Sequence, residues 1–342
     1  MLGKFWKKGQ DFLGVNYPIL CGAMTWVSES SLVAAVSNLG AFGCLAGGNM
    51  SPDLLAEEID NTRKLTDKPF GVNVITIAPK YEQHLEVIKA KKPPFVIFAG
   101  SFPHAYEIKA VKESGAKVIC FASNDSIAVR MINNGADALI LEGSEAGGHI
   151  GHVSLMILIQ QVLFQINSVP IFVAGGIATG KMMAHLLLMG ASGVQMGTKF
   201  VLSQECKAHP KFKESFVKAR ARDAVSTPQI GSELHVVAVR ALKNKGMNEF
   251  ANLQIELIQK IRLGEMSQKE SQFKVEEFWM GALRTAAVEG DVVRGSVMAG
   301  QSVGLVDKIQ PLKEIIDELI NDAEDELKRI RVIVQPCVSS QL

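Results

Sequence analysis

The 342-residue sequence has little excess charge and few cysteines, and each shortage excludes a class of protein. Lys and Arg total 36 against 35 Asp and Glu, which leaves a formal net charge of +1. Without a basic excess, nucleic acid is not an expected partner. The five cysteines include no CxxC pair. This argues against a zinc ribbon or a locally spaced iron–sulfur cluster and favours a reducing compartment.

Long hydrophobic runs are also missing. The N-terminal stretch MLGKFWKKGQDFLG has lysines but no continuous apolar segment, so no signal peptide is expected. The longest apolar segment, LMILIQQVLFQI (155–166), contains three glutamines. It is too short to span a bilayer and predicts a buried helix instead. We therefore expect a cytoplasmic protein without a membrane partner.

Several catalytic motifs are absent or incomplete. GGIATGKM matches the start of a P-loop, but Met182 stands where the motif needs Ser or Thr for magnesium. No GxGxxG follows the first predicted strand, which argues against a doubly wound dinucleotide fold. There is no GxSxG nucleophile elbow. No His, Asp and Glu set has metal-ligand spacing, so no metal site is predicted.

What the sequence does contain is a repeated alternation of short apolar runs and amphipathic stretches. The runs are rich in Val, Ile and Phe and lack strict alternation, as expected of strands buried on both faces. They lie at 18–24, 42–48, 70–76, 95–100, 117–123, 138–143, 170–176 and 193–201. Four of the intervening stretches end in Gly-Ala, at Gly40, Gly115, Gly135 and Gly190, which predicts left-handed helix caps.

Eight strands, each followed by a helix or loop, predict an α/β protein with a (β/α)₈ TIM barrel. The barrel is expected to comprise residues 1–201 and 281–330. Residues 202–280 are polar and have helical periodicity, so we expect a helical insertion, or lid, after strand eight. Residues 331–342 are expected to form a flexible tail.

Small and polar residues follow the predicted strands, and in a barrel these positions share one rim, which carries the active site. In LEGSEAGGHIGH (141–152), His149 stands among glycines and is predicted to be the catalytic acid–base residue. AGGIATGK and QMGT follow strands seven and eight. There, glycine amides and the N-terminus of a helix beginning near Thr179 favour a phosphate.

These motifs carry a family resemblance across about residues 15 to 307. With AMTWVSE, GGNMSPDLL, EGSEAGGHIG, VPIFVAGGIATG, GASGVQMGTKFV, AHPKFKE and GDVVRGSVMAGQSVGLV, the chain resembles the nitronate monooxygenases, formerly called 2-nitropropane dioxygenases. Within that family it is most similar to the flavin-type enoyl-[acyl-carrier-protein] reductase II branch. The chain differs from the family pattern at Ala23, where the family has glycine, and at Val236-Val237, where a Gly-His pair is expected.

The resemblance implies a barrel that holds FMN without a covalent bond, with His149 as the catalytic histidine. Met24 and Ala23 would lie against the flavin ring, and Asn73 would bond its polar edge. Gly175, Gly176, Gly197 and Thr198 would hold the phosphate. The expected cofactor-binding set is completed by Gly22, Glu142, Gly147, Gly148, Ala174, Gln195 and Met196.

Three functions remain open from the sequence. The first is reduction of a trans-2-enoyl thioester carried on acyl carrier protein, with NADH or NADPH as co-substrate, in fatty acid synthesis. The second is flavin-dependent oxidation of nitroalkane-derived nitronates. The third is a flavin-free phosphate-binding barrel, such as an isomerase or a nucleotide sensor. A small-molecule or acyl-carrier-protein-bound substrate and a homodimer are expected.

Overall fold

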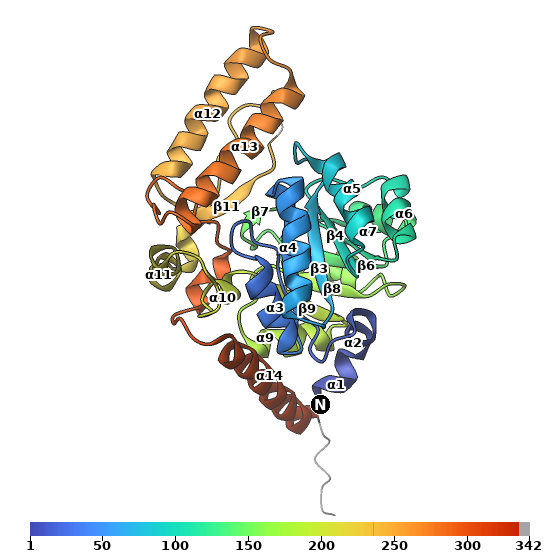
Figure 1. The fold of residues 1–342 in the computed structure, drawn as a ribbon. Coiled ribbons are helices and arrows are strands. Elements are labelled where there is room, and N and C mark those ends of the chain that lie inside the picture. The colour runs from blue at the N-terminus through green and yellow to red at the C-terminus, as the bar shows by residue number, and fades with distance from the viewer. Residues whose placement is uncertain (235, 335–342) are drawn as a thin grey trace, which may run out of the picture.

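Eight parallel strands close into a barrel in the computed structural model, which describes residues 1–234 and 236–334 (Figure 1). Around the barrel the order is β1-β2-β3-β4-β5-β6-β8-β9, and β9 pairs with β1 to complete the circle. The predicted TIM barrel is therefore confirmed. The strands are β1 Ile19–Cys21, β2 Phe42–Ala46, β3 Phe70–Ile75, β4 Phe95–Ala99, β5 Lys117–Ala122, β6 Ala138–Glu142, β8 Ile171–Ala174 and β9 Gly193–Met196.

Helices surround the barrel and connect its strands. They are α3 Ser30–Asn38, α4 Pro52–Leu65, α5 Tyr81–Lys91, α6 Ala105–Glu113, α7 Asp125–Asn133, α8 Leu155–Leu158, α9 Gly180–Leu188 and α10 Thr198–Val201. The four Gly-Ala glycines have φ between +83° and +104°, which confirms the left-handed caps. The predicted buried helix is only half buried. α8 continues as a π-helix over Ile159–Leu163, and Met156 and Phe164 are exposed.

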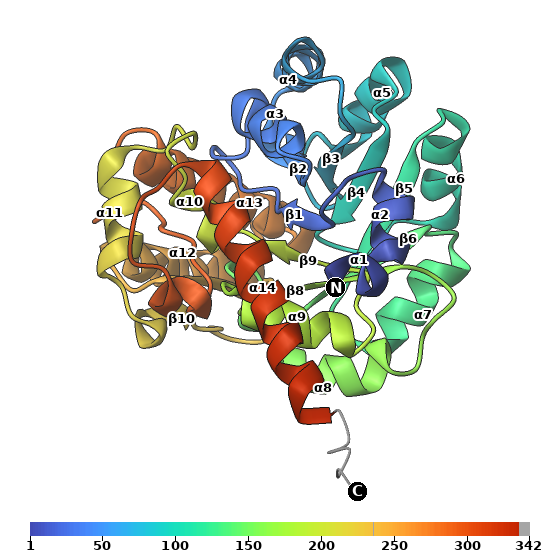
Figure 2. The same cartoon turned by 90° about the horizontal axis from the view of Figure 1, so that it is seen from below.

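The barrel interior is filled by large apolar side chains from several strands, among them Phe42, Ile97 and Phe172. Its amino-terminal end is covered by α1 Leu2–Phe5 and α2 Lys7–Leu13, seen from below in Figure 2. Phe12 of α2 packs its ring 5.7 Å from that of Phe95. This end is thus closed, so a ligand can enter only from the opposite, carboxyl end of the strands.

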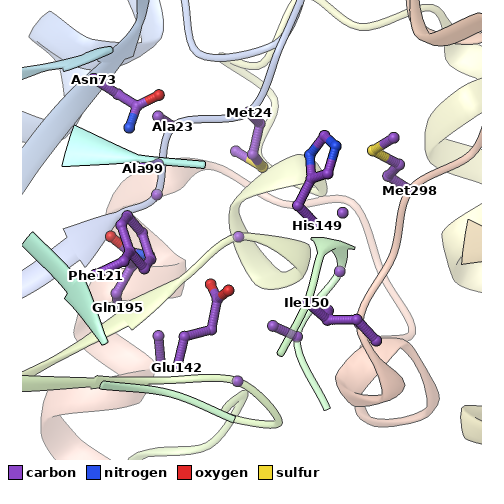
Figure 3. Close-up of a pocket in the computed structure, with 18 of the residues that line it drawn as sticks. Ala23, Met24, Asn73, Ala99, Phe121, Glu142, His149, Ile150, Gln195 and Met298 are labelled. Atoms are coloured by element: carbon purple, nitrogen blue, oxygen red, sulfur yellow. The ribbon is translucent and has the colours of Figure 1, made fainter. Parts of the chain in front are cut away.

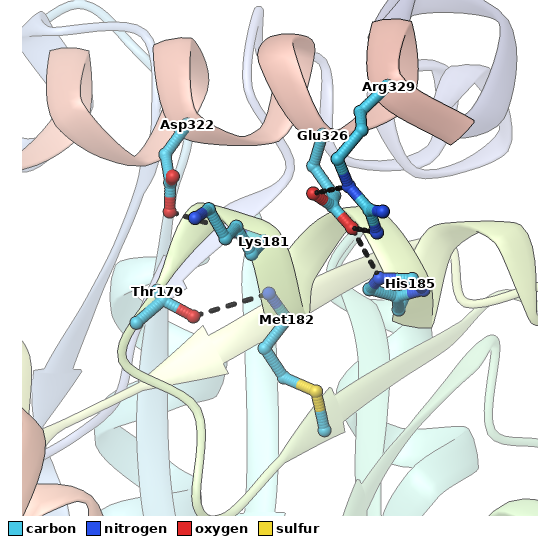
Figure 4. Close-up of polar contacts among 7 residues, drawn as sticks. All are labelled: Thr179, Lys181, Met182, His185, Asp322, Glu326 and Arg329. Atoms are coloured by element: carbon cyan, nitrogen blue, oxygen red, sulfur yellow. Dashed lines mark hydrogen bonds and ion pairs between the residues drawn. The ribbon is translucent and has the colours of Figure 1, made fainter. Parts of the chain in front are cut away.

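The last helix, α14 Leu312–Val334, lies along α9 and holds it through acidic side chains (Figure 4). Asp322 accepts a hydrogen bond from the Lys181 amide at 3.0 Å, and Glu326 accepts one from His185 at 2.8 Å. Glu326 is only 5% exposed. Part of the acidic side of α14 therefore makes an intramolecular contact. The contact fixes the start of α9, which follows strand β8 at the rim.

The insertion predicted to be helical also contains strands. After α11 Pro210–Lys218, β10 Ala224–Ser226 and β11 Val239–Leu242 form an antiparallel sheet with β7 Gly148–His149. Strands this short leave no periodic pattern in the sequence, because their pairing partners are distant in the chain. The helical insertion expected at residues 202–280 therefore also includes two short strands that the sequence does not indicate.

Two long helices, α12 Lys245–Arg262 and α13 Gln268–Ala287, complete the insertion and project beyond the carboxyl end of the barrel (Figure 1). They pack around Phe250 and Trp279, whose ring centroids are 4.3 Å apart. The expected boundary at residue 280 falls inside α13, so this helix belongs to the insertion as a whole. The insertion is a compact unit with its own small core.

At the C-terminal end, α14 extends to Val334, so residues 331–334 are helical rather than part of a tail. The remainder of the predicted flexible tail, 335–342, lies outside the described residues. Among the helices that the structure describes, none combines the length and apolar character needed to cross a membrane.

Candidate active site

A cavity of about 510 Å³ opens at the carboxyl end of the barrel, between the strand ends and α13 (Figure 3). A volume of this size is typical of a cofactor or substrate site. The structure brings all fifteen predicted site residues to its lining. They are Gly22, Ala23, Met24, Asn73, Glu142, Gly147, Gly148, His149, Ala174, Gly175, Gly176, Gln195, Met196, Gly197 and Thr198.

The first loop, Gly22 to Trp26, is fixed from two sides. The Ser28 hydroxyl donates to the Gly22 carbonyl at 2.9 Å and accepts from the Met24 amide at 3.0 Å. Trp26 has a left-handed backbone with φ +64°, and its indole N–H donates to the Met280 carbonyl of α13 at 3.1 Å. A strained non-glycine residue persists only where surrounding contacts hold it. These contacts position Ala23 and Met24 at the cavity and tie the loop to the insertion.

Asn73 lies inside β3, two residues before its end at Ile75. It is 6% exposed, and its side-chain amide donates to the Ile97 carbonyl at 3.1 Å. This bond leaves the side-chain oxygen as an acceptor at the cavity. Asn73 can therefore accept a hydrogen bond from a polar ligand edge.

The loops after β8 and β9 form the candidate phosphate site. Gly175 and Gly176 have φ of +95° and +72°, which side chains rarely adopt. In the described part of the chain, the amides of Gly175, Gly176 and Gly197 donate to no acceptor. The β8–β9 register places Ala174 beside Gln195 and so brings the two loops together. Free amides on neighbouring loops are suited to phosphate oxygens.

The helix that follows strengthens this anion site. As predicted, α9 begins just after Thr179, whose hydroxyl accepts from the Met182 amide at 3.2 Å (Figure 4). The N-terminus of a helix carries a partial positive charge that favours an anion. On the other loop, the Thr198 hydroxyl accepts from the Gly300 amide at 3.1 Å, so its own hydrogen remains available to a ligand.

His149 lies on β7, which β11 holds through the pair Val239–His149. Its Nε2 is 3.2 Å from a carboxylate oxygen of Glu276 on α13, a side chain that is only 7% exposed. Burial lowers the pKa of His149, but the charge of Glu276 and its hydrogen bond outweigh burial and raise this pKa above the usual value. The imidazole is therefore favoured as a proton donor, and its other nitrogen can face a ligand.

Glu142, at the end of β6, points into the same cavity (Figure 3). Its carboxyl has no partner among the described residues. Burial raises the pKa of Glu142 to about 8, so near neutral pH it is mostly an uncharged acid that can donate a hydrogen bond. An unpartnered polar group facing a cavity requires either water or a ligand.

The residues that the insertion contributes to the site were not predicted from the sequence. Trp279 and Leu283 of α13 line the cavity, together with Met298. Glu276 of the same helix does not line it but bonds His149, which does. No local motif marks them, because they approach His149 only through the fold. Val236 and Val237, which stand where the resemblance predicts a Gly-His pair, also lie in the lining.

Comparison with known proteins assigns this arrangement to a family. The family model described as nitronate monooxygenase matches residues 7–82 and 75–322. The chain belongs to the nitronate monooxygenase family. The predicted resemblance is thereby confirmed, and the protein is a flavin-dependent oxidoreductase.

Several known proteins are similar to the chain over nearly their whole length. The solved structure of FabK from Thermotoga maritima is 39% identical with a TM-score of 0.84, covering 95% of this chain and 98% of that one. A (3aS,4S,5R,7aS)-5-hydroxy-7a-methyl-1-oxo-octahydro-1H-indene-4-carboxyl-CoA dehydrogenase from Rhodococcus jostii is 30% identical, covering 94% and 95%. A probable nitronate monooxygenase from Staphylococcus aureus is 28% identical, covering 92% and 97%.

Proposed function

We propose that the protein is an FMN-dependent reductase of enoyl thioesters that uses NADH or NADPH, as expected for the enoyl-[acyl-carrier-protein] reductase II branch. The similarity to FabK over 95% of the chain supports this branch. A relative named for a carboxyl-CoA substrate supports a thioester in the site. The observation that carries the proposal is the His149–Glu276 pair above a cavity with free phosphate-binding amides.

The residues present fit FMN. The amides of Gly175, Gly176 and Gly197, with the Thr198 hydroxyl, would hold its phosphate. The Asn73 oxygen and the protonated Glu142 carboxyl offer one acceptor and one donor to the ring system. Met24 and Ala23 supply an apolar contact at the cavity. When bound, FMN supplies hydride transfer.

The role of the chain is to bind and polarise the thioester. Because the carboxylate of Glu276 favours the protonated imidazole, His149 donates a hydrogen bond to the thioester carbonyl. It also holds a proton for delivery to the α-carbon. A protonated histidine suits an acid better than a base. This favours reduction over a mechanism in which His149 abstracts a proton from a nitroalkane.

Nitronate oxidation is the second candidate, supported by the family model and by the staphylococcal relative. In that case, the cationic His149 would bind the nitronate anion. Anaerobic stopped-flow absorbance separates the two candidates. A reductase is expected to lose its visible flavin absorbance with NADH or NADPH and to regain it with crotonyl thioester. Bleaching by a nitronate but by neither nicotinamide nucleotide would overturn the proposal.

His149→Ala tests the assigned residue in the same assay. We expect it to retain bound flavin and its reduction by the nicotinamide nucleotide. Reoxidation by the enoyl thioester should become slower by about 10²–10⁴-fold, the usual contribution of a positioned acid or base. Unchanged reoxidation with full flavin occupancy would remove His149 from the mechanism.

A further inference from the structure

A second cavity, of about 730 Å³, opens beside the candidate active site between α13 and the segment that follows β3. The two cavities share part of their lining, namely Gly100, Ser101, Phe102, Val236 and Val237. Glu276 lines the second cavity and bonds His149 in the first. The second cavity is therefore continuous with the side of the active site where His149 lies.

The outer walls of this second cavity carry two exposed cations. Lys80 immediately precedes α5, and Lys269 lies in the first turn of α13 on the opposite wall. Neither lysine forms an ion pair with any residue in the described ranges. The Lys269 ammonium lies 5.7 Å from the centroid of the Phe273 ring. Glu82, in the first turn of α5, adds one exposed carboxylate to the lining.

We propose that the second cavity holds the phosphopantetheine arm of the thioester substrate, with Lys80 and Lys269 beside its phosphate; this rests on the proposed function. The reacting thioester must reach His149, so the arm attached to its sulfur must leave through an adjoining opening. The shared apolar lining suits the part of the arm nearest the thioester. The two unpaired cations farther out match the charge of the phosphate.

The same cations could instead meet the diphosphate of a nicotinamide dinucleotide, and steady-state kinetics separates the two sources. The probes are crotonyl-4′-phosphopantetheine and crotonyl-pantetheine, which differ only in the phosphate, each with saturating NADH. For the wild-type protein we expect a KM about fivefold lower for the phosphorylated thioester, as two exposed ion pairs would give. The paired variant Lys80→Ala/Lys269→Ala should abolish this difference and leave kcat and the KM for NADH unchanged.

Two further variants sharpen this test. Glu82→Gln removes the opposing charge and should lower the KM for the phosphorylated thioester alone. Lys274→Ala is the matched control, because this exposed α13 lysine pairs with Glu277 and does not line the cavity. It should leave every KM unchanged.

Three results would overturn the proposal. The first is equal KM values for the two thioesters in the wild-type protein. The second is a paired variant that raises both thioester KM values alike. The third is a raised KM for NADH, which would assign the cavity to the dinucleotide. Reduction of neither thioester by the wild-type protein would instead overturn the proposed function itself, and this inference with it.

Discussion

Replacing Glu142 by Gln should make the flavin-free protein more stable, and increasingly so as the pH rises. Burial raises the pKa of this carboxyl from its usual 4.5 to about 8. The unfolded chain releases the proton near pH 4.5, whereas the folded protein keeps it until about pH 8. Below pH 4.5 the carboxyl costs no stability. Between the two values the folded state loses stability with each unit of pH, and above pH 8 the loss is constant.

The size of the effect follows from the same two values. The difference between about 8 and 4.5 corresponds to roughly 5 kcal/mol, at about 1.4 kcal/mol per pH unit. This is an upper limit, because Glu142 faces an open cavity in which water stabilises the charged form. We therefore expect about 2 kcal/mol at pH 8.5 and less than about 1 kcal/mol at pH 5.

Urea unfolding of the flavin-free protein, followed by tryptophan fluorescence at pH 5 and pH 8.5, measures this difference. Gln is neutral throughout and has nearly the same shape as the protonated acid, so the variant should gain stability relative to wild type at the higher pH. Glu57→Gln, at an exposed position of α4, is the control for loss of a surface carboxyl. A Glu142→Gln stability difference that is independent of pH, or that shrinks as the pH rises, would show that burial does not raise the pKa of Glu142.

Three further predictions concern the site. Glu276→Gln should lower the pKa of His149 and move the alkaline limb of the kcat–pH profile to lower pH. Glu277→Gln, on the exposed face of α13, should leave this profile unchanged. An unchanged profile for Glu276→Gln would contradict the His149–Glu276 pairing. Gly176→Ala, which adds a methyl group at φ +72°, should weaken FMN binding measured by fluorescence. Gly190→Ala, at φ +104° with open space around it, imposes similar backbone strain and should leave FMN affinity unchanged. Equal losses of FMN affinity in the two variants would mean that backbone strain, and not contact with FMN, causes the loss. Trp26→Phe removes the hydrogen bond to the Met280 carbonyl and should lower the opening free energy of α13 by about 1 kcal/mol. Faster amide hydrogen exchange in α13 would measure this loss.

The barrel was predictable from the sequence because its strands are buried on both faces. Such strands must be nearly continuous apolar runs, and their glycine caps are visible in the sequence. Because the strands of such a barrel are parallel, the residues that follow them all lie on one rim. This is why residues as distant as Gly22 and Thr198 could be assigned to one site before any contact was known.

The part of the site formed by the insertion and β7 could not be predicted in the same way. β7, β10 and β11 have two to four residues each, too few to show a period. Glu276 meets His149 across 127 positions of sequence, and its own helix gives it no distinguishing pattern. These contacts depend on how the insertion packs over the barrel. The contact that raises the pKa of the candidate catalytic residue His149 therefore depends on the fold and not on a local sequence pattern.

The barrel mouth is expected to bind the phosphate and the ring system of FMN together. Titration of flavin-free protein with FMN and with riboflavin, followed by quenching of flavin fluorescence, tests it most directly. Because the free amides of the β8 and β9 loops are assigned to the phosphate, FMN should bind at least about 100-fold more tightly than riboflavin. Equal affinity for the two flavins, or no binding of FMN, would show that these amides do not form an FMN phosphate site.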